Sequence, residues 1–347
     1  MSAPTTSGPT LRDVAAHAAV SLKTASRVLN EDPKVATATR ELVMRAMREL
    51  DYSPDPAARS LKAGRDRVVG VVVDSVGDVF FAQLVAEVES VLDAAGYRVL
   101  IASSNRDAQR ERDTVRDFVQ RRCAGLIVAP LARTSLSDVR TRDVPVVFVD
   151  RVGDLPGSRS VVVDDAALAH EATAHLLAHG HRRVALLSDR PVMDTTRQRH
   201  EGFRAAMAQA GLEVDERLVR SDVPGPEDVM RVLVELLALD EPPTALISTN
   251  TRLTLGVVPA LHQHGRTDVA LVAFGDFPLA ESLTPAVTVV EHSPEVVGAA
   301  AARALLEQMQ GPPGEGAPPE VATDRTPPAV LHVPARLVPR GSGELSP

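Results

Sequence analysis

The chain has 347 residues, which is too long for one ordinary hydrophobic core and predicts two or three domains. Its 44% hydrophobic and 24% charged residues are typical of a globular protein, and the lack of an apolar run of eighteen residues argues against a membrane protein. The single cysteine, Cys123, excludes an internal disulfide, and the N-terminus lacks a basic segment followed by an apolar one, so we expect a cytoplasmic protein.

The net charge of −8 is unevenly distributed along the chain. Residues 1–67 carry 11 Lys and Arg against 8 Asp and Glu, whereas the remainder carries 27 against 38. A mildly basic head on an acidic body indicates that a polyanion such as a nucleic acid would be bound by the head. An ordinary solvated surface would also tolerate this small excess of positive charge. The residue pattern of the head is needed to distinguish it from a nucleic-acid-binding surface.

The stretch LRDVAAHAAVSLKTASRVLN, residues 11–30, predicts two short helices separated by a tight turn. Thr10 can cap the first helix, and Ser21 can cap the second, whose basic side chains lie opposite its apolar face. With a third helix from Thr37, this is the pattern of a helix-turn-helix, whose second helix enters the major groove of DNA. A small helical bundle with a charged outer face would show the same periodicity.

The residues themselves are more specific than their periodicity. The stretch 11–30 and the later YSPDPAARSLKAGR closely resemble the head of the lac/galactose repressor (LacI/GalR) family of transcription regulators. Further similarity follows in the family's order, in VVGVVV, LLAHGHRRVALL, RQRHEGFRAAMAQAG, TALISTN and VPARLVPRGSGE. The resemblance implies a helix-turn-helix head, a hinge helix and a bilobed, periplasmic-binding-protein-like α/β core. It also implies a homodimer on a pseudo-palindromic operator, usually a repressor, whose affinity for DNA is changed by a small metabolite bound between the lobes.

On this resemblance, the base-reading residues are Leu22, Lys23 and Arg27 at the start and middle of the second helix. Arg and Lys can donate to guanine in the major groove, so these residue types fit that role. The resemblance assigns phosphate contacts, which fix the register on DNA, to Thr10, Ser21, Thr24, Ser26 and Asn30. One residue departs from the pattern: Ala19 stands in the turn where a glycine is usual, and it has to adopt that glycine's conformation at some strain.

Residues 53–64, SPDPAARSLKAG, predict a short helix between the head and the body. Asp55 can cap it and Pro56 suits its first turn, but about eight residues are too few for a stable isolated helix in water. An unstructured linker is the alternative interpretation. The resemblance implies that the segment becomes helical on DNA, pairs with its counterpart in the other subunit and inserts Leu61 into the minor groove, where an apolar wedge kinks the duplex.

From Val68 onward, short valine-rich runs such as RVVGVVV, AGLIVAP, RRVALLS and DVALVAF alternate with segments of helical periodicity. This alternation predicts two α/β units, each a parallel sheet covered by helices, with a ligand held between them. We divide the chain into a head with hinge at 1–66 and a core at 67–347. On the resemblance, the N-lobe comprises 67–163 and 291–323 and the C-lobe 164–290 and 324–347, with crossings near 161–165, 289–292 and 322–328.

Because ligands in such folds bind beyond the carboxyl ends of parallel strands, polar residues at strand ends are candidates for an effector site. Arg199, three residues before Gly202 and Phe203, matches the family's ligand-clamping arginine, and a guanidinium can clamp hydroxyls, a carboxylate or a phosphate. The other candidates are Asp74, Asp78, Phe80, Phe81, Asp150, Arg151, Ser188, Arg190, Asn250 and Asp276, with Asp189 inside the range 188–190. Each could equally be an ordinary polar group at the end of a loop or a salt-bridge partner.

Two positions depart from the sugar-binding members of the family. Thr251, after Asn250, and Gly275 both stand where an acid is common, and both absent carboxylates would accept sugar hydroxyls. Since Arg199 keeps a cation in the cleft, the sequence predicts that anionic or less hydroxylated ligands are favoured over a plain hexose. Asp276 lies one residue along and is the candidate substitute for the second acid.

Other function classes are less well supported. The sequence contains no glycine-rich phosphate loop, Walker motif or G-x-S-x-G elbow that would indicate an enzyme or a cofactor. His175, His179 and His181 have metal-like spacing, but no cysteine or fourth ligand lies near them in the sequence, so no metal is predicted. A solute-binding protein would share the core without the helix-turn-helix, and an activator would share both. No leucine heptads follow the last strand, so a dimer is expected rather than a tetramer.

Overall fold

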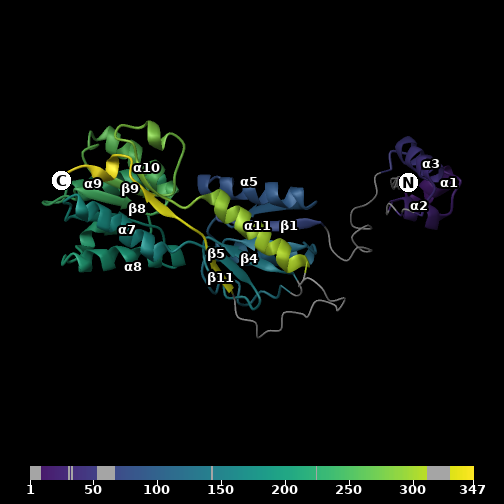
Figure 1. Cartoon of the computed structure of the whole chain (residues 1–347), viewed down its shortest axis with the longest axis horizontal. Helices are drawn as coiled ribbons and strands as arrows, with labels where there is room; N and C mark the ends of the chain where they lie inside the picture. The colour runs from purple at the N-terminus through teal and green to yellow at the C-terminus, as the bar shows by residue number, and fades with distance from the viewer. Residues whose placement is uncertain are drawn as a thin grey trace, which may run out of the picture. The chain divides into compact units, whose positions relative to one another are not determined.

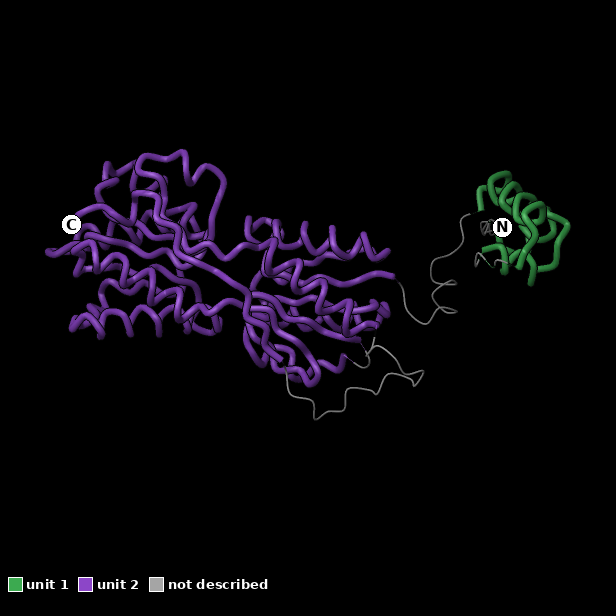
Figure 2. The backbone as a smooth tube through the Cα atoms, in the orientation of Figure 1, with its two compact units in different colours: residues 1–66 green, residues 67–347 purple. Residues whose placement is uncertain are grey.

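The structure is a computed structural model of the whole chain, and it describes residues 9–29, 32, 34–52, 67–141, 144–223, 225–310 and 329–347. It contains two compact units, residues 1–66 and residues 67–347, coloured separately in Figure 2. Asn30, Leu61 and the predicted hinge helix lie outside the described residues. Within the described ranges, no helix is long and apolar enough to cross a membrane.

The first unit is built from three helices, α1 (Leu11–His17), α2 (Leu22–Leu29) and α3 (Thr37–Glu49). Thr10 caps α1 in a reciprocal capping box with Asp13, and the Ser21 hydroxyl accepts from the Thr24 amide at the start of α2. Between the two helices, Ala19 has a φ of +52°, a left-handed conformation that costs a non-glycine residue some strain. The core of the unit is small and aliphatic, with buried Val14, Ala15, Ala18, Ala25, Val28, Val43 and Ala46.

The N-lobe of the second unit is a six-stranded parallel sheet (Figure 1). From edge to edge its strands are β11 (Ala329–His332), β5 (Arg159–Val162), β4 (Val146–Val149), β3 (Gly125–Val128), β1 (Val68–Val73) and β2 (Arg98–Ser103). Val69, Val71 and Val73 of β1 pack on one side with α5 (Val79–Ala94) and α11 (Pro294–Gln310), whereas Val72 packs on the other with α6 (Ala108–Gln120). Because both faces are covered, VVGVVV is apolar without alternation.

The C-lobe is a second six-stranded sheet. Its strands in spatial order are β12 (Arg336–Val338), β10 (Thr288–Glu291), β9 (Ala270–Phe274), β8 (Ala245–Ser248), β6 (Val184–Leu187) and β7 (Val219–Arg220). β12 runs antiparallel to β10, and the other neighbours are parallel. Helices α7 (Asp165–Ala178) and α8 (Asp194–Gln209) share one core cluster, and α9 (Pro226–Leu237) and α10 (Thr251–Gln263) share another. Short 3-10 turns occupy Glu216–Leu218, Ala280–Ser282 and Ser342–Glu344.

The chain passes between the two sheets three times, after β5, after β10, and between β11 and β12 (Figure 1). The third passage differs from the sequence prediction, which placed it at 322–328 and ended the N-lobe at 323. β11 pairs in parallel with β5, with Leu331 opposite Val161, so the N-lobe continues through His332 and the passage lies at 333–335. The partner strand of β11 is distant in the sequence, so local periodicity could not assign β11 to a lobe.

Candidate functional site

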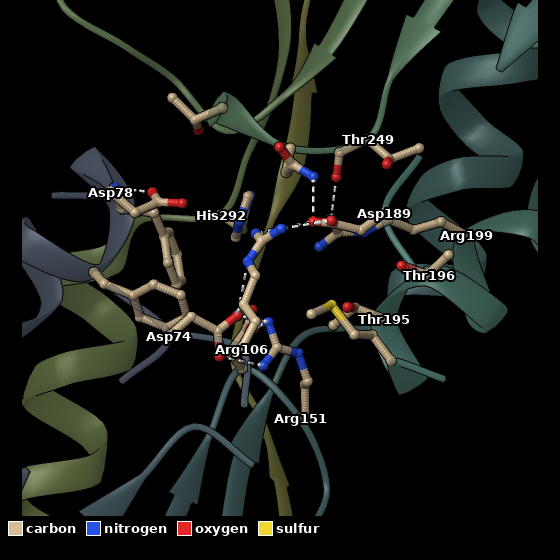
Figure 3. Close-up of a pocket in the computed structure, with 16 residues that line it drawn as sticks. Asp74, Asp78, Arg106, Arg151, Asp189, Thr195, Thr196, Arg199, Thr249 and His292 are labelled. Carbon is tan, nitrogen blue, oxygen red and sulfur yellow. Dashed lines mark hydrogen bonds and ion pairs between the residues drawn. The ribbon is translucent and has the colours of Figure 1, made fainter. Parts of the chain in front are cut away.

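A cavity lies between the two lobes, where the carboxyl ends of the parallel strands meet (Figure 3). Its free volume is about 40 Å³, which is room for a few water molecules but not for a ring-shaped ligand. The N-lobe lines it with Asp74, Asp78, Phe80, Phe81, Arg106, Asp150 and Arg151. The C-lobe and the second passage supply Asp189, Met193, Thr195, Thr196, Arg199, Thr249, Asn250, Thr251 and His292.

On the N-lobe side, Asp74 and Arg151 form a buried, two-pronged ion pair. The Arg151 guanidinium donates to the two Asp74 carboxylate oxygens at 3.0 and 2.8 Å and to the Pro130 carbonyl at 3.2 Å. Asp150 lies 3.1 Å from Arg151 and has a φ of +66°, a conformation that Asp tolerates better than most residues. Burial raises the pKa of Asp150, and the charge of Arg151 opposes this rise. Paired charges therefore hold this wall in place.

An aromatic face lies beside these carboxylates. Phe80 packs against His292 with ring centroids 4.9 Å apart and edge-on against Phe81 at 5.2 Å. Asp78 caps α5 by accepting from the Phe80 amide at 3.0 Å, and burial raises the pKa of its carboxyl. Burial, reinforced by the charge of Arg199, lowers the pKa of His292 to about 4, so its ring is neutral near pH 7. An apolar ring face next to hydrogen-bond acceptors suits a cyclic polar molecule.

On the C-lobe side, Arg199 of α8 is fixed from three directions. Its Nε donates to Asp165 at 2.7 Å, its Nη1 donates to the Thr249 carbonyl, and its guanidinium carbon lies 4.5 Å from the centre of the Phe274 ring. Arg199 and Asp165 are 6% and 2% exposed. Arg199 therefore lines the cavity, but several of its donors are already used within the C-lobe.

Asp189, just after β6, accepts hydrogen bonds from both lobes. Within the C-lobe it accepts from Asn250 Nδ2 at 2.9 Å and from Arg252 at 2.8 Å. From the N-lobe, the Arg106 guanidinium reaches across the cleft and donates to both carboxylate oxygens at 2.6 and 3.0 Å (Figure 3). Arg106 Nε also lies 3.9 Å from Asp74. These contacts join the two walls in one charged network.

Of the predicted effector residues, Asp74, Asp78, Phe80, Phe81, Asp150, Arg151, Arg199 and Asn250 line this cavity. Ser188 and Arg190 do not: the Ser188 hydroxyl bonds His200 Nε2 at 2.7 Å, and Arg190 pairs with Asp222 at 3.4 Å. Successive side chains of an extended segment point to opposite sides, so Asp189 faces the cavity and its two neighbours do not.

Asp276 also lies outside the lining set. Its carboxylate accepts from the Arg340 guanidinium at 2.9 and 2.6 Å, and this partner lowers the pKa of the Asp276 carboxyl. The side chain is therefore engaged with the C-terminal segment and does not replace the acid that is absent at Gly275.

Sequence reasoning did not single out six of the lining residues: Arg106, Met193, Thr195, Thr196, Thr249 and His292. Arg106 and Thr249 follow β2 and β8. They could have been predicted by the same rule as the other lining residues, because they too are polar residues just after a strand. Thr195 and Thr196 enter on the first turn of α8, and His292 lies in a passage between lobes. No local pattern marks side chains at those places as lining a cleft.

The charge balance of the cavity does not support the predicted preference for anionic ligands. Four carboxylates and three guanidiniums line it, and Asp165 pairs with one of those guanidiniums from behind. That prediction rested on Arg199 and on positions 251 and 275, whereas the ends of other strands supply carboxylates. A preference for anionic ligands therefore has no basis in the charge of this cleft.

Two of the three spaced histidines bind the C-terminal segment, and the third, His179, bonds the His175 carbonyl at 2.9 Å. His181 bonds the Leu345 carbonyl at 2.9 Å and Thr244 Oγ1 at 2.9 Å, and His175 pairs with Glu344. Across the described ranges, no group of three or more His, Cys, Asp or Glu side chains could hold a metal ion.

In the head, Leu22 and Lys23 are exposed at the start of α2, with Leu22 at 45%. The Arg27 guanidinium donates to the Asp32 carboxylate at 2.8 Å, and this bond lowers the pKa of Asp32. The hydroxyls of Ser21 and Thr24 bond each other at 2.8 Å. The predicted base-reading side chains therefore lie on one solvent-facing helix, and Arg27 already has a carboxylate partner.

Comparison with known proteins shows what these two units are. A model of bacterial regulatory proteins of the lacI family matches residues 10–55, and a model of periplasmic binding proteins and the sugar binding domain of the LacI family matches residues 66–340. The chain belongs to the LacI family. The predicted family and fold class, a helix-turn-helix head on a bilobed α/β core, are confirmed.

This LacI-family protein is similar to known repressors over most of its length. The HTH-type transcriptional repressor PurR of Vibrio cholerae serotype O1 (strain M66-2) is 30% identical over 307 residues, which is 87% of this chain and 91% of the relative. A putative ribose operon repressor from Burkholderia thailandensis has 32% identity and a TM-score of 0.66, covering 79% of this chain and 99% of that one. The Lac repressor bound to ONPG in the repressed state has 26% identity and a TM-score of 0.79, covering 97% and 100%.

The LacI-family protein is therefore a DNA-binding transcription regulator with a small-molecule-binding core, and it is not an enzyme. Since both the head and the core match, it also differs from a solute-binding protein that has the core alone.

Proposed function

We propose that this LacI-family regulator represses transcription in the cytoplasm as a homodimer, and that a small polar metabolite bound between the lobes changes its affinity for operator DNA. The observation that carries the proposal is the buried cavity lined from both lobes. A ligand there touches both walls, so its binding energy biases the angle between the lobes. Coupling of this kind is typically about 1–3 kcal/mol.

The DNA-binding part of the proposal concerns α2. Lys23 and Arg27 donate to guanine in the major groove, and Leu22 makes apolar contact with base edges. Thr10, Ser21, Thr24, Ser26 and Asn30 bond phosphates, which fixes register without selecting sequence. Leu61, from the segment outside the described residues, inserts into the minor groove. The bond from Arg27 to Asp32 uses Nε, so Arg27 can donate to a base from its terminal nitrogens without leaving Asp32.

Exposed aliphatic side chains support the homodimer. Leu100 and Ile101 are 37% and 40% exposed on β2, which is an edge strand of the N-lobe sheet. On the C-lobe, Leu255 and Leu279 are 43% and 74% exposed. Apolar side chains on an open sheet edge are typical of a surface that pairs with another chain. A two-fold dimer would match a pseudo-palindromic operator.

The chemistry of the cavity favours an uncharged cyclic metabolite with several hydroxyls. The carboxylates and guanidiniums nearly balance in charge, and the Asp189 carboxylate offers acceptors that suit hydroxyl donors. The Phe80 and His292 rings provide a flat face against which a sugar ring can pack. Whether such a ligand releases the protein from DNA or holds it there is decided by the experiment.

The test uses the full-length protein and a pool of randomised palindromic DNA. We expect selection to enrich one two-fold symmetric site, bound by a dimer in gel shifts at fixed salt. A thermal-shift screen of neutral monosaccharides, sugar acids, sugar phosphates and nucleobases should then give a hit among the neutral sugars, and the hit should change operator affinity. If no DNA sequence is enriched, or if only anionic compounds bind, the corresponding half of the proposal is wrong.

A further inference from the structure

The cavity is too small for the ligand that it is proposed to bind. Sites for ring-shaped metabolites have volumes of about 300 Å³ or more, whereas about 40 Å³ is free here. A lining group must therefore move before such a molecule can enter. Arg151 and Arg199 bond within their own lobes, but Arg106 makes its two-pronged contact with the opposite lobe, at Asp189 (Figure 3).

We infer that Arg106 is an internal competitor of the effector: its guanidinium occupies the donor position on Asp189, and an uncharged ligand with two adjacent hydroxyls binds by taking that position. The inference rests on the proposed function of the cleft. A guanidinium edge and a pair of vicinal hydroxyls both present two parallel donors to the two oxygens of a carboxylate. An anionic ligand could not make this exchange, because it would place a second negative charge against Asp189.

The exchange leaves no buried charge without a partner. A released Arg106 has acids on its own lobe, since its Nε already lies 3.9 Å from Asp74 and its charge acts on Asp78. Asp189 keeps its hydrogen bonds from Asn250 and Arg252. Displacement of a buried ion is costly mainly when its partner is left uncompensated, and that condition does not arise here.

Arg106 is also placed where it can move. It lies in the loop between β2 and α6, and its side chain is 19% exposed, against 5% and 7% for Arg151 and Arg199. Its guanidinium can therefore swing toward solvent without disturbing either core. With Arg106 on Asp189, the two lobes are tied together in the closed arrangement before any ligand enters.

The first test compares full-length wild type with Arg106→Gln by calorimetry against a panel of neutral aldopentoses and aldohexoses. Arg106→Gln removes the state in which Arg106 is bonded to Asp189, so it should tighten the binding of the best sugar by about threefold to tenfold. The size of the effect depends on the fraction of wild-type molecules in that state. Arg121→Gln is the matched control, because it removes the same charge from the same lobe at a side chain that is 63% exposed. Equal or weaker sugar binding by Arg106→Gln would overturn the inference, since Arg106 would then be a bystander or a ligand contact.

The second test needs neither DNA nor sugar. Spin labels at Glu89→Cys on α5 and Ala205→Cys on α8 report the distance between the lobes, while Cys123, at 2% exposure, is protected from labelling. Arg106→Gln should lengthen this distance, and millimolar guanidinium chloride, compared with sodium chloride at equal ionic strength, should shorten it again. An unchanged distance in the variant would overturn the inference. A changed distance in a protein that binds none of the sugars would keep the tie between Arg106 and Asp189 but overturn the competition with a ligand that carries two adjacent hydroxyls.

Discussion

Gly275 leaves the space that Thr251 fills. An ideal Cβ built on Gly275, whose φ is +85°, would lie 2.2 Å from Thr251 Oγ1. The two departures from the sugar-binding relatives' pattern are therefore one structural feature: a side chain at position 275 and the threonine at position 251 exclude each other.

This exclusion predicts a non-additive pair of substitutions. Gly275→Asp should lower the free energy of unfolding by about 2–4 kcal/mol, because it combines left-handed strain with overpacking. Thr251→Ala removes the clashing hydroxyl, so it should recover part of that loss when both substitutions are present. Urea unfolding of the four members of the cycle measures the coupling. Strictly additive effects would show that the two side chains do not share this space.

The second prediction concerns the buried pair of Arg199 and Asp165. Arg199→Ala leaves a buried carboxylate without its guanidinium, which should cost about 3–5 kcal/mol in the free energy of unfolding. Arg197→Ala, on the same helix but with a side chain 54% exposed, should cost less than about 1 kcal/mol. A similar, small cost for both would contradict the structural role of Arg199. Ligand binding by wild type and by Arg199→Ala is compared under conditions in which the same fraction of each protein is folded.

His292 predicts a specific dependence of stability on pH. Its pKa is about 4 in the folded chain and about 6.5 in the unfolded chain, so between these values only the unfolded chain binds the proton. The contribution of His292 to the free energy of unfolding is therefore present above pH 6.5 and is lost as pH falls through 4, by about 3 kcal/mol in total.

His292→Phe keeps a ring against Phe80 and cannot take up a proton. Urea unfolding from pH 7 to pH 4.5 should show a steeper fall for wild type than for this variant. Parallel curves would mean that the His292 ring is not buried as described.

The fourth prediction tests the major-groove residues. Lys23→Ala and Arg27→Ala should each weaken binding to a selected operator by about 1–3 kcal/mol and relax base preference at one position of each half-site. Arg45→Ala on α3 removes the same charge and should change affinity without changing base preference. The measurement is a gel shift at fixed salt with single-base operator variants. Unaltered base preference in Arg27→Ala would show that Arg27 does not contact a base in the major groove.

The fifth prediction concerns the strained turn between α1 and α2. Ala19→Gly should raise the stability of the head by about 0.5–1 kcal/mol, because glycine adopts a φ of +52° without the penalty of a Cβ. Ala16→Gly, in the last turn of α1, is the control and should lower stability, because glycine is a poorer helix former than alanine. Thermal unfolding of the full-length variants, followed by helical circular dichroism, distinguishes the two directions. Destabilisation by both substitutions would show that Ala19 is not strained.

The sequence by itself determined the local elements. Thr10 and Ser21 mark the starts of α1 and α2, and the valine-rich runs mark the buried strands, because caps and apolar periodicity act over a few residues. The rule that ligands bind at the carboxyl ends of parallel strands also predicted correctly that Asp74, Asp150 and Asn250 line the cavity, since parallel strands end at the same edge of a sheet.

Only the tertiary structure decided which long-range partners those residues meet. β11 joins β5 in the N-lobe although it follows the C-lobe strands, and Asp276 turns to Arg340. Arg106 meets Asp189 only because two lobes close on each other. Burial and ion pairing between distant segments depend on how sheets and lobes pack. The apolar periodicity of a strand or a helix reflects only its own local surroundings, so it does not predict that packing.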